Sequence, residues 1–345
     1  MPDAPPPTPP VPPVPPAAPS PPSTGDVTVV VVNYNGGPML RDCIASLAAQ
    51  TRRPDRVLVV DNASSDGSTD GLELAFDRVC VLHAGANLGF AAANNLAIAR
   101  ATDSDWIALL NPDAVAAPDW LERLLEAAAA HPDCTMFGCR MLADAPGARL
   151  DGVGDAYHTS GLPWRVGHGE PAAGRHLTDA EIFAPCAAAA LYRADLLRSL
   201  GGFDADFFCY VEDVDLGFRA RLAGHRARYV ARAVVVHAGS GLVGRHSDFQ
   251  LYHGHRNLVW AFVRDMPAPL LWLYLPQHLL MNLVTLVAFA ARGRGGVLWR
   301  AKRDALLGVP RAWAKRRATQ AARRVPAARL REAMQRGWPR RHASR

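Results

Sequence analysis

Short apolar runs alternate with amphipathic segments over the first 130 residues of the chain. Val27–Val32 is a continuous β-branched run, which is typical of a strand buried on both faces. The same pattern predicts three more strands, at Arg56–Val60, Val79–His83 and Trp106–Leu110. Helical patterns lie between or after these runs, at Met39–Gln50, Ala91–Arg100 and Asp119–Ala130. The alternation predicts an α/β fold, with a mostly parallel sheet flanked by crossover helices.

The pattern is less regular further along the chain. Residues 140–185 are rich in Gly, His and Pro, and no element is assigned to them. A helix is predicted over Ala187–Leu200, and the acidic segment that follows predicts a helix continuing to Arg221. Arg228–Val236 contains another β-branched run, which predicts a strand that ends at His237.

Polar residues follow each of the first four predicted strands, in clusters at Asn33–Asn35, Asp61–Asp66, Asn87 and Asn111–Asp113. Ligands of open α/β sheets bind outside the carboxyl ends of the strands, so the clusters predict one binding site at that edge. No G-x-G-x-x-G motif follows the first strand and the chain has no P-loop, which disfavours a dinucleotide-binding fold. Val27–Gly37 also lacks Lys and Arg, which disfavours a nucleotidyltransferase.

Charge is distributed unevenly along the chain. Arg292–Arg345 carries 17 Lys and Arg against two Asp and Glu, although the net charge of the whole chain is only +6. The remaining residues are therefore acidic, which argues against a nucleic-acid partner. The basic carboxy-terminal segment instead predicts contact with an anionic membrane surface.

The chain begins with a proline-rich segment, residues 1–25, that has no periodic apolar pattern. We expect it to be a disordered tail. It lacks the basic start and the apolar core of a signal peptide. The six cysteines form neither a CxxC pair nor a cluster with zinc-like spacing, so they are interpreted as reduced residues of a cytosolic domain.

The strongest local motif is the acidic segment Tyr210–Leu216, which contains Glu212, Asp213 and Asp215. Three carboxylates in four positions among apolar neighbours are costly unless a positive group or a shared proton offsets them. One of them can act as a general base towards a hydroxyl group. The other interpretation is an acidic helix start, where carboxylates suit the helix dipole.

Three other polar features are also open to two interpretations. Asn111-Pro112-Asp113 follows a buried strand, where Asp113 can bind a hard cation or simply form a turn. His237 ends a strand and is either a metal ligand or a structural histidine. The loop Asp61–Gly67 can bind a base or ribose through its side chains, or can be a hydrogen-bonded turn before a helix.

Taken together, these motifs resemble the family-2 glycosyltransferases, and more narrowly their rhamnosyltransferase-like branch. The resemblance spans about residues 27–260 in the right order and is carried by VVVVNYN from Val29, VVDNASSDGS from Val59, NLGFAAANN from Asn87, LNPD from Leu110 and EDVDL from Glu212. It implies a GT-A (Rossmann-like) fold, an inverting mechanism and a nucleoside-diphosphate sugar as donor.

The resemblance also implies roles for individual residues. Those on the nucleotide side would be Val32, Tyr34, Asn35, Asp61, Asn87, Gly89 and Asn111. Asp113 would hold Mg²⁺ or Mn²⁺ in the family's D-x-D element, whose first position is Asn in this chain, and His237 would be a further ligand. Asp213 matches the family's catalytic base, and Glu212 or Asp215 would orient the acceptor or support the base. One departure from the family is Cys186, where relatives commonly carry Gly.

The carboxy-terminal third predicts membrane association. The segment 269–291 holds 23 residues without a formal charge, long enough to span a bilayer, but Pro276, Gln277, His278 and Asn282 interrupt it. A single crossing would separate the basic stretch after Arg292 from the catalytic domain, so an in-plane or re-entrant helix is favoured. A single span and a buried core helix remain open. Trp299–Arg317 predicts a basic amphipathic helix, followed by frayed terminal residues.

We therefore expect four parts: the tail 1–25, a catalytic domain over 26–262, membrane-associating helices over 263–318 and a basic tail over 319–345. The expected enzyme moves rhamnose or a related hexose from a dTDP- or UDP-linked donor to a cell-envelope glycan or polyprenyl-linked acceptor. It would work as a peripheral or monotopic protein on the cytoplasmic face of the plasma membrane. The alternative is a catalytically idle nucleotide-binding scaffold in a membrane glycan-assembly complex.

Overall fold

The computed structural model describes residues 25–143, 149–238 and 247–337. The predicted proline-rich tail lies almost wholly outside the described residues. The first half of the chain alternates strands and helices, as β1 (Val27–Asn33), α1 (Gly37–Ala48), β2 (Arg56–Asp61), α2 (Leu72–Ala75), β3 (Val79–His83), α3 (Gly89–Arg100), β4 (Trp106–Leu110), β5 (Ala114–Ala116) and α4 (Trp120–Ala130). The predicted strands and helices of this half are confirmed, with ends shifted by a few residues at most.

The second half begins with strands and ends with helices. The strands are β6 (Cys134–Leu142), β7 (Leu150–Gly152), β8 (Asp155–Tyr157), β9 (Pro163–Arg165), β10 (Ala180–Ile182), β11 (Ala189–Arg193) and β12 (Arg226–His237). The helices are α5 (Ala194–Ser199), the short η1 (Ala205–Phe207), α6 (Glu212–Leu222), α7 (Asp248–Asp265), α8 (Ala268–Ala290), α9 (Gly295–Ala321) and α10 (Ala327–Ala333).

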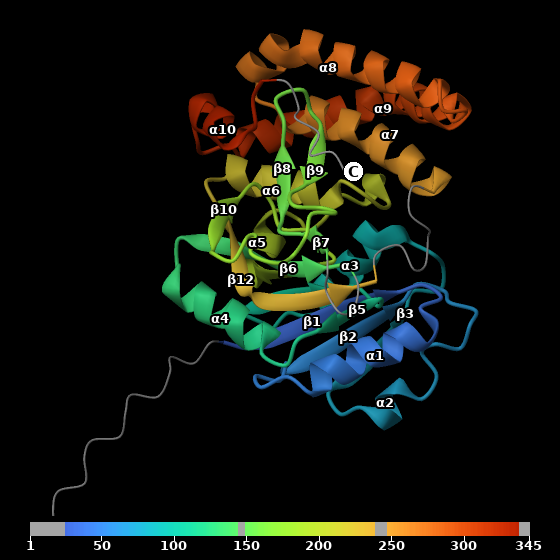
Figure 1. Cartoon of the computed structure of the whole chain (residues 1–345), viewed down its shortest axis with the longest axis vertical. Helices are drawn as coiled ribbons and strands as arrows, with labels where there is room; N and C mark the ends of the chain where they lie inside the picture. Colours follow the sequence, from blue (N-terminus) through green and yellow to red (C-terminus); the bar gives the residue numbers. More distant parts are fainter. Residues whose placement is uncertain (1–24, 144–148, 239–246, 338–345) are drawn as a thin grey trace, which may run out of the picture.

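One mixed sheet forms the centre of the molecule, in the order β10-β12-β6-β11-β4-β1-β2-β3 (Figure 1). The half of the sheet that comes from the first four long strands of the chain, β4-β1-β2-β3, is parallel throughout. Strand β11 enters antiparallel between β4 and β6, and β12 returns parallel to β6. The predicted mostly parallel α/β sheet with flanking helices is confirmed.

Both faces of the sheet are covered, which explains the uninterrupted apolar runs of the central strands. Alternate residues of β1 divide between two cores: Val29 and Val31 pack with α1 and α4 on one side, and Val30 packs with α3 on the other. Trp120, at the start of α4, has no exposed side-chain surface in the first of these cores. A strand with apolar neighbours on both faces has no polar positions to alternate with, so its sequence is continuously apolar.

The helix predicted over Ala187–Leu200 is wrong in its first half. Residues 189–193 form β11, which pairs with Trp106–Leu110 of β4, and the helix α5 begins only at Ala194. The run Cys186–Ala190 is rich in alanine, which favours helix in isolation. Its small side chains instead let β11 fit between two neighbouring strands at the centre of the sheet, and this pairing overrides the local preference.

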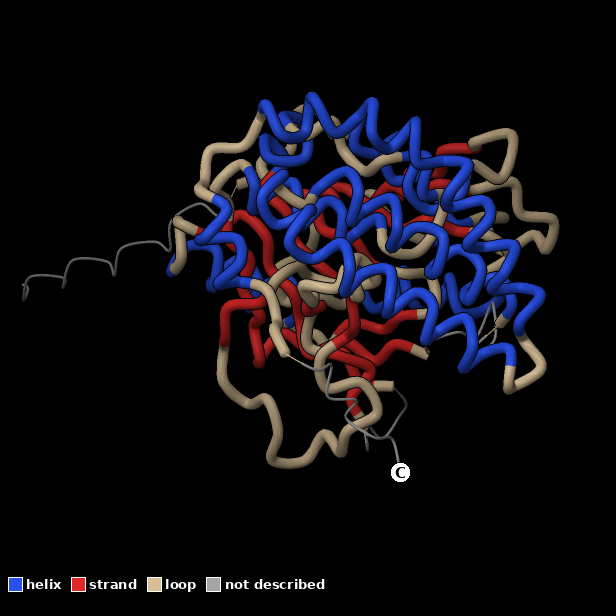
Figure 2. Tube along the Cα trace, turned by 90° about the horizontal axis from the view of Figure 1, so that it is seen from above, coloured by secondary structure: helices blue, strands red, loops and turns tan. Residues whose placement is uncertain are grey.

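The carboxy-terminal helices form a layer over one end of the sheet domain, and Figure 2 shows it from above. Helix α9 confirms the helix predicted over Trp299–Arg317, and α7 runs continuously through the expected boundary at residue 262. The prediction that the terminal residues are frayed is wrong for residues 327–335. Leu330 of α10 and Met334, the residue after α10, are buried against the body. Residues 338–345 lie outside the described part.

The packing of α6 on the segment before β11 yields a stability prediction. A Cβ added at Gly217 of α6 would lie 2.4 Å from the Cβ of Ala184, so the backbones must separate to admit it. Gly217→Ala should lower the free energy of unfolding by about 1–3 kcal/mol. In contrast, nothing lies within 4 Å of a Cβ added at Gly254 in α7. Gly254→Ala should raise the free energy of unfolding by about 0.5–1 kcal/mol.

Chemical denaturation of both variants measures these changes. Equal effects of the two substitutions would contradict the close contact between α6 and Ala184.

Candidate functional site

The carboxyl ends of the parallel strands bring the predicted polar clusters together at one edge of the sheet. Asn33, the last residue of β1, is paired in register with Asp61, the last residue of β2, and Asp61 is paired with His83 of β3. Asn111 follows β4 directly, and its backbone N–H donates to the carbonyl of Ala188. The prediction that these clusters share an edge is confirmed by this register.

The loops after β1 and β2 are held together by short polar side chains. The Asn33 amide donates to the hydroxyls of Ser64 (3.0 Å) and Ser68 (2.9 Å). Asn35 has a left-handed backbone (φ 53°), and its side-chain oxygen accepts the N–H of Ser65 at 2.8 Å. The ring of Tyr34 is exposed beside this network, and Val32 is half-buried beneath it. The two loops therefore form a preorganised polar wall.

Asp61 is a buried carboxylate at the base of this wall. Its oxygens accept the N–H of Ser64 at 3.1 Å and contact Nδ1 of His83 at 3.2 Å. Burial acts to raise the pKa of Asp61, but the hydrogen bonds from Ser64 and His83 outweigh burial and hold the pKa below its ordinary value. Asp61 therefore carries a negative charge near pH 7 and can accept hydrogen bonds from a ligand.

The start of α3 lies next to this carboxylate. The Asn62 amide donates to the side-chain oxygen of Asn87 at 2.9 Å, and that oxygen also accepts the N–H of Gly89 at 3.0 Å. Gly89 has φ 78°, and a Cβ there would lie 2.5 Å from the ring of Phe208. Only glycine fits this approach between the start of α3 and the turn that contains Phe208.

Asp113 and His237 form a second, more buried cluster beyond the end of β4. Oδ1 of Asp113 lies 3.2 Å from Nε2 of His237, and Asn111 is 3.3 Å from the same nitrogen. Asp151 contacts the other ring nitrogen, Nδ1, at 2.9 Å. A carboxylate that fixes one nitrogen of a histidine while the other faces a second carboxylate is the usual arrangement around a bound divalent cation.

The charges of this cluster act on one another strongly. Burial acts to lower the pKa of His237, but hydrogen bonds to Asp113 and Asp151 outweigh it and raise the pKa to about 9. Burial acts to raise the pKa of Asp151, but Arg165, His168 and His237 together hold it far below its ordinary value. Asp151 is therefore a charged anchor for the histidine.

Arg165 connects this cluster with the acidic segment at the start of α6. Its guanidinium donates to Asp151 at 2.6 Å and lies 2.8 Å from the sulfur of Cys186. The sulfur of Cys186 lies within 4.8 Å of a carboxylate oxygen of Asp155 and of a carboxylate oxygen of Asp213. Gly152 makes room for the arginine stem, since a Cβ there would lie 2.2 Å from Cγ of Arg165.

Asp213 is half-buried, and two backbone N–H groups hold its carboxylate. Oδ2 accepts from Ala187 at 3.1 Å, and Oδ1 accepts from its neighbour Val214 at 2.8 Å. Glu212 and Asp155 are buried beside it. Burial, and then the charge of Asp213, raise the pKa of both neighbours well above the ordinary range. The carboxylate of Asp213 is thus held in a fixed orientation, and its side chain remains partly exposed.

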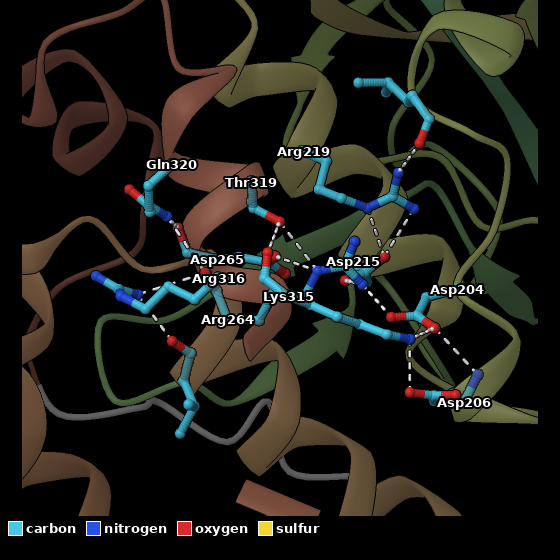
Figure 3. Close-up of polar contacts among 12 residues, drawn as sticks. Asp204, Asp206, Asp215, Arg219, Arg264, Asp265, Lys315, Arg316, Thr319 and Gln320 are labelled. Carbon is cyan, nitrogen blue, oxygen red and sulfur yellow. Dashed lines mark hydrogen bonds and ion pairs between the residues drawn. The ribbon is translucent and has the colours of Figure 1, made fainter. Parts of the chain in front are cut away.

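Asp215 is not brought together with Asp213. It points to the other side of α6, where its fully buried carboxylate accepts from Arg219 at 2.8 Å and lies 3.2 Å from Arg264 of α7 (Figure 3). Asp215 therefore links α6 to α7 through ion pairs, while Glu212 and Asp213 remain at the site edge.

Three residues of the site were missed by the sequence analysis, namely Asp151, Asp155 and Arg165. All lie in the stretch 140–185, on or next to the short strands β7, β8 and β9. Strands of three residues are too short to show a period of two. The signal that was available is Gly152 beside Asp151, since a glycine inside a strand often marks a close approach.

Comparisons with known proteins identify the family of the chain. Residues 28–201 match the family described as glycosyl transferase family 2. The chain is 30% identical over 297 residues to the N-acetylglucosaminyl-diphospho-decaprenol L-rhamnosyltransferase of Mycobacterium tuberculosis, covering 75% of this chain and 94% of that protein. It is 24% identical over 225 residues to the O-antigen chain rhamnosyltransferase RfbN of Salmonella typhimurium, covering 61% of this chain and 66% of that protein.

A solved structure is similar over most of the chain. The mannosyltransferase PcManGT from Pyrobaculum calidifontis, in complex with GDP-Man and Mn²⁺, superposes with a TM-score of 0.54 at 23% identity, covering 88% of this chain and 87% of that one. This likeness supports the GT-A fold. With the family match and the M. tuberculosis relative, it leads to one conclusion: the chain belongs to glycosyl transferase family 2 and is a glycosyltransferase of the rhamnosyltransferase-like group.

Proposed function

We propose that the chain is an inverting, metal-dependent enzyme that moves rhamnose or a related hexose from a nucleoside-diphosphate donor to a hydroxyl of a lipid-linked or cell-envelope glycan. The observation that carries the proposal is the placement of Asp213 at the same edge as the Asp113–His237 pair, with Arg165 between them. The M. tuberculosis relative, named for rhamnosyl transfer to a diphospho-decaprenol glycan, supports the acceptor class.

The donor would lie across the carboxyl ends of β1 to β4. We propose that Asp61 binds the base, that Val32, Tyr34 and Asn35 line the nucleotide pocket, and that Asn87, Gly89 and Asn111 face the ribose and diphosphate. Asp61, as a charged carboxylate, accepts an N–H of the base. A dTDP- or UDP-linked donor offers such an N–H on its pyrimidine ring.

The residues present fit a divalent metal ion. Asp113 offers a carboxylate oxygen 3.2 Å from Nε2 of His237, while Asp151 holds Nδ1, the opposite nitrogen. A carboxylate ligand suits both Mn²⁺ and Mg²⁺, and the imidazole favours Mn²⁺, the softer of the two ions. Bound there, the ion would neutralise charge on the departing diphosphate. Asp113 and His237 would hold it, and Asp151 would keep the imidazole oriented.

Asp213 would take the proton of the acceptor hydroxyl as its oxygen attacks the anomeric carbon. The new carbon–oxygen bond forms while the bond from that carbon to the diphosphate oxygen breaks, so one in-line displacement inverts the configuration. The N–H groups of Ala187 and Val214 hold the carboxylate in place for this step. Glu212 would contribute to the acceptor side of the same edge.

Replacement of the proposed base tests the reaction. Asp213→Asn should lower kcat by about 10³-fold or more, since the amide cannot take a proton, while nucleotide affinity stays within about threefold. The assay uses dTDP-rhamnose with an N-acetylglucosaminyl-diphospho-polyprenol acceptor. Asp42→Asn, on the exposed side of α1, is the control and should transfer at the normal rate.

Full transfer by Asp213→Asn would sink the proposed role of this carboxylate. A chain that acts only as a nucleotide-binding scaffold would show no transfer in either variant.

The metal site has a separate test by calorimetry. The unmodified chain should bind one of dTDP, UDP and GDP more tightly with Mn²⁺ than without it. Asp113→Asn should lose most of the gain from Mn²⁺ while keeping the metal-free affinity, since Asp61 and Asn87 are untouched. An Mn²⁺ gain that survives in Asp113→Asn would exclude Asp113 as a ligand. Equal binding with and without Mn²⁺ in the unmodified chain would exclude metal dependence itself.

Helix α8 carries an apolar stripe on the face turned away from the body. Among the described residues, it is the helix long and apolar enough to cross a membrane by length and composition. Its exposed large residues recur at helical spacing, as Trp272, Leu273, Leu279, Leu280, Leu283, Val284 and Val287. Only 17% of its most apolar window is buried, which does not agree with a buried core helix.

The opposite face of α8 is bound to the body. The ring of His278 stacks on Phe262 of α7 with centroids 4.0 Å apart, and its Nδ1 lies 2.8 Å from the carbonyl oxygen of Ser160. A helix that crosses the bilayer would have to leave these contacts. We therefore propose that α8 lies in the membrane plane, with the stripe in the lipid interface.

Helix α9 supports this orientation with both apolar and basic groups. Its large exposed apolar residues are Trp299, Leu306, Leu307 and Trp313. Exposed arginines accompany them, at Arg300, Arg303, Arg311 and Arg317. Apolar and cationic groups on adjoining helices suit the anionic cytoplasmic leaflet. Attachment there would also place the enzyme on the side that holds nucleotide sugars.

Vesicle binding tests the in-plane helix. Leu280→Glu with Leu283→Glu should reduce binding to phosphatidylglycerol vesicles at least about tenfold, because both carboxylates would enter the lipid interface. Leu74→Glu is the matched control, since Leu74 is 95% exposed on α2, at the opposite end of the molecule from α8 (Figure 1). The full chain should leave membranes on alkaline carbonate extraction. Resistance to carbonate would indicate a spanning helix, and unchanged binding of the double variant would exclude the stripe.

A further inference from the structure

The turn before the proposed base has an unusual backbone. Phe208, Tyr210 and Val211 have φ values of 63°, 68° and 72°, although none of them is glycine. The left-handed region is costly for residues with a Cβ, and most costly for a β-branched residue such as Val211. Val211 is the residue before α6, so the helix that presents Glu212 and Asp213 starts from this strained backbone.

Helix α7 holds the turn through one buried side chain. Asn257 has no exposed surface, and its amide nitrogen lies 2.9 Å from the carbonyl oxygens of Phe207 and Cys209 and 2.7 Å from that of Tyr210. A strained conformation persists only where the surrounding structure fixes it. Each of the three carbonyls belongs to the residue directly before one of the left-handed residues.

Neighbouring residues of α7 also contact the turn. Arg256 donates to the carbonyl of Phe207 at 3.0 Å and to the side-chain oxygen of Asn257 at 2.9 Å, and it stacks over the ring of Trp260. The ring of Phe208 stacks on His253 with centroids 5.4 Å apart. On its other side, Phe208 meets Gly89 at the start of α3.

The same helix is fixed to the body beyond the turn. Arg264 of α7 bonds Asp204 and lies 3.2 Å from Asp215 of α6, so α7 reaches both sides of the segment 204–215 (Figure 3). Lys315 of α9 joins Asp204 at 2.6 Å. Helix α7 is therefore a rigid support against which the turn is set.

We propose that Asn257 is the positioning residue for the catalytic carboxylate: it locks the left-handed turn Phe208–Val211 and so sets where α6 presents Asp213. This inference rests on the proposed function, because Asp213 is the base only in that proposal. Asn257 does not touch the substrate. It acts through three carbonyl groups, and its loss lets the turn relax and moves Asp213 relative to the acceptor.

The test replaces Asn257 by a residue with the same number of side-chain heavy atoms that cannot donate a hydrogen bond. Asn257→Leu should lower kcat about 30-fold or more, because displacement of a reacting group by about 1 Å costs on the order of 10² in rate. The KM of dTDP-rhamnose should stay within about threefold, since Asp61 and Asn87 are untouched. Gln320→Leu is the matched control: it also removes a side-chain amide, which caps the carbonyls of Arg264 and Asp265 at the end of α7. Its kcat should not change.

A second substitution separates positioning from folding. Val211→Gly removes the penalty of the left-handed backbone at φ 72°, so the turn can hold its shape without the asparagine. In the Asn257→Leu background it should restore kcat by about tenfold. A purely structural role for Asn257 predicts no such recovery.

Each other outcome decides between the proposals. Wild-type kcat in Asn257→Leu, beside an inactive Asp213→Asn, overturns the positioning role and leaves the proposed function standing. Loss of nucleotide binding together with transfer, without recovery by Val211→Gly, also overturns it. Full activity of Asp213→Asn removes the proposed base instead.

Discussion

The buried carboxylate of Asp151 is the constraint on which the site depends. A charge in the interior is stable only where opposite charges and hydrogen-bond donors surround it. Asp151 meets this requirement with the guanidinium of Arg165 at 2.6 Å and the imidazole of His237 at 2.9 Å. Because both partners share one carboxylate, the orientation of the histidine towards Asp113 and that of the arginine towards Cys186 are fixed together.

The acidic groups on the other side of Arg165 differ in their environment, which separates their roles. Glu212 and Asp155 are buried, and burial together with the charge of Asp213 raises the pKa of each. Asp213 is half-buried and accepts two backbone N–H groups. Carboxyl groups in close contact do not all ionise together. Glu212 and Asp155 therefore hold their protons more tightly than ordinary carboxyl groups, whereas the carboxylate of Asp213 is the one that two backbone N–H groups orient.

The sequence analysis predicted the half of the fold in which local and tertiary preferences agree. Val29–Val31 is apolar on successive positions because both faces of β1 are covered, and this alone identifies a buried strand. The carboxyl ends of β1, β2 and β4 then place Asn33, Asp61 and Asn111 at one edge by topology. The shared edge of these residues, which the proposed function assigns to the nucleotide, could be predicted in this way.

The rest depends on contacts between distant residues that leave no local pattern. Asp151 meets His237 across 86 positions of the chain, from a strand of only three residues. The Ala-rich run before Leu191 looks helical, and only its place between β4 and β6 makes it a strand. Asp215 lies only two residues after the proposed base, yet Arg264, 49 residues later, fixes it on another side of α6.

The carboxy-terminal helices show the same limit of prediction from the sequence. Composition alone could not separate a spanning α8 from one lying in the interface. The proposed in-plane position rests on the contact of His278 with Phe262 of α7 and on the exposure of Leu280 and Leu283. Helix α7 uses its own other contacts, through Asn257, to hold the turn before α6. The exposed apolar stripe of α8 and the buried amide of Asn257 on α7 thus lie on different helices of one layer. Substitutions at the two places should therefore act independently, so that membrane attachment and the chemical step can be measured apart.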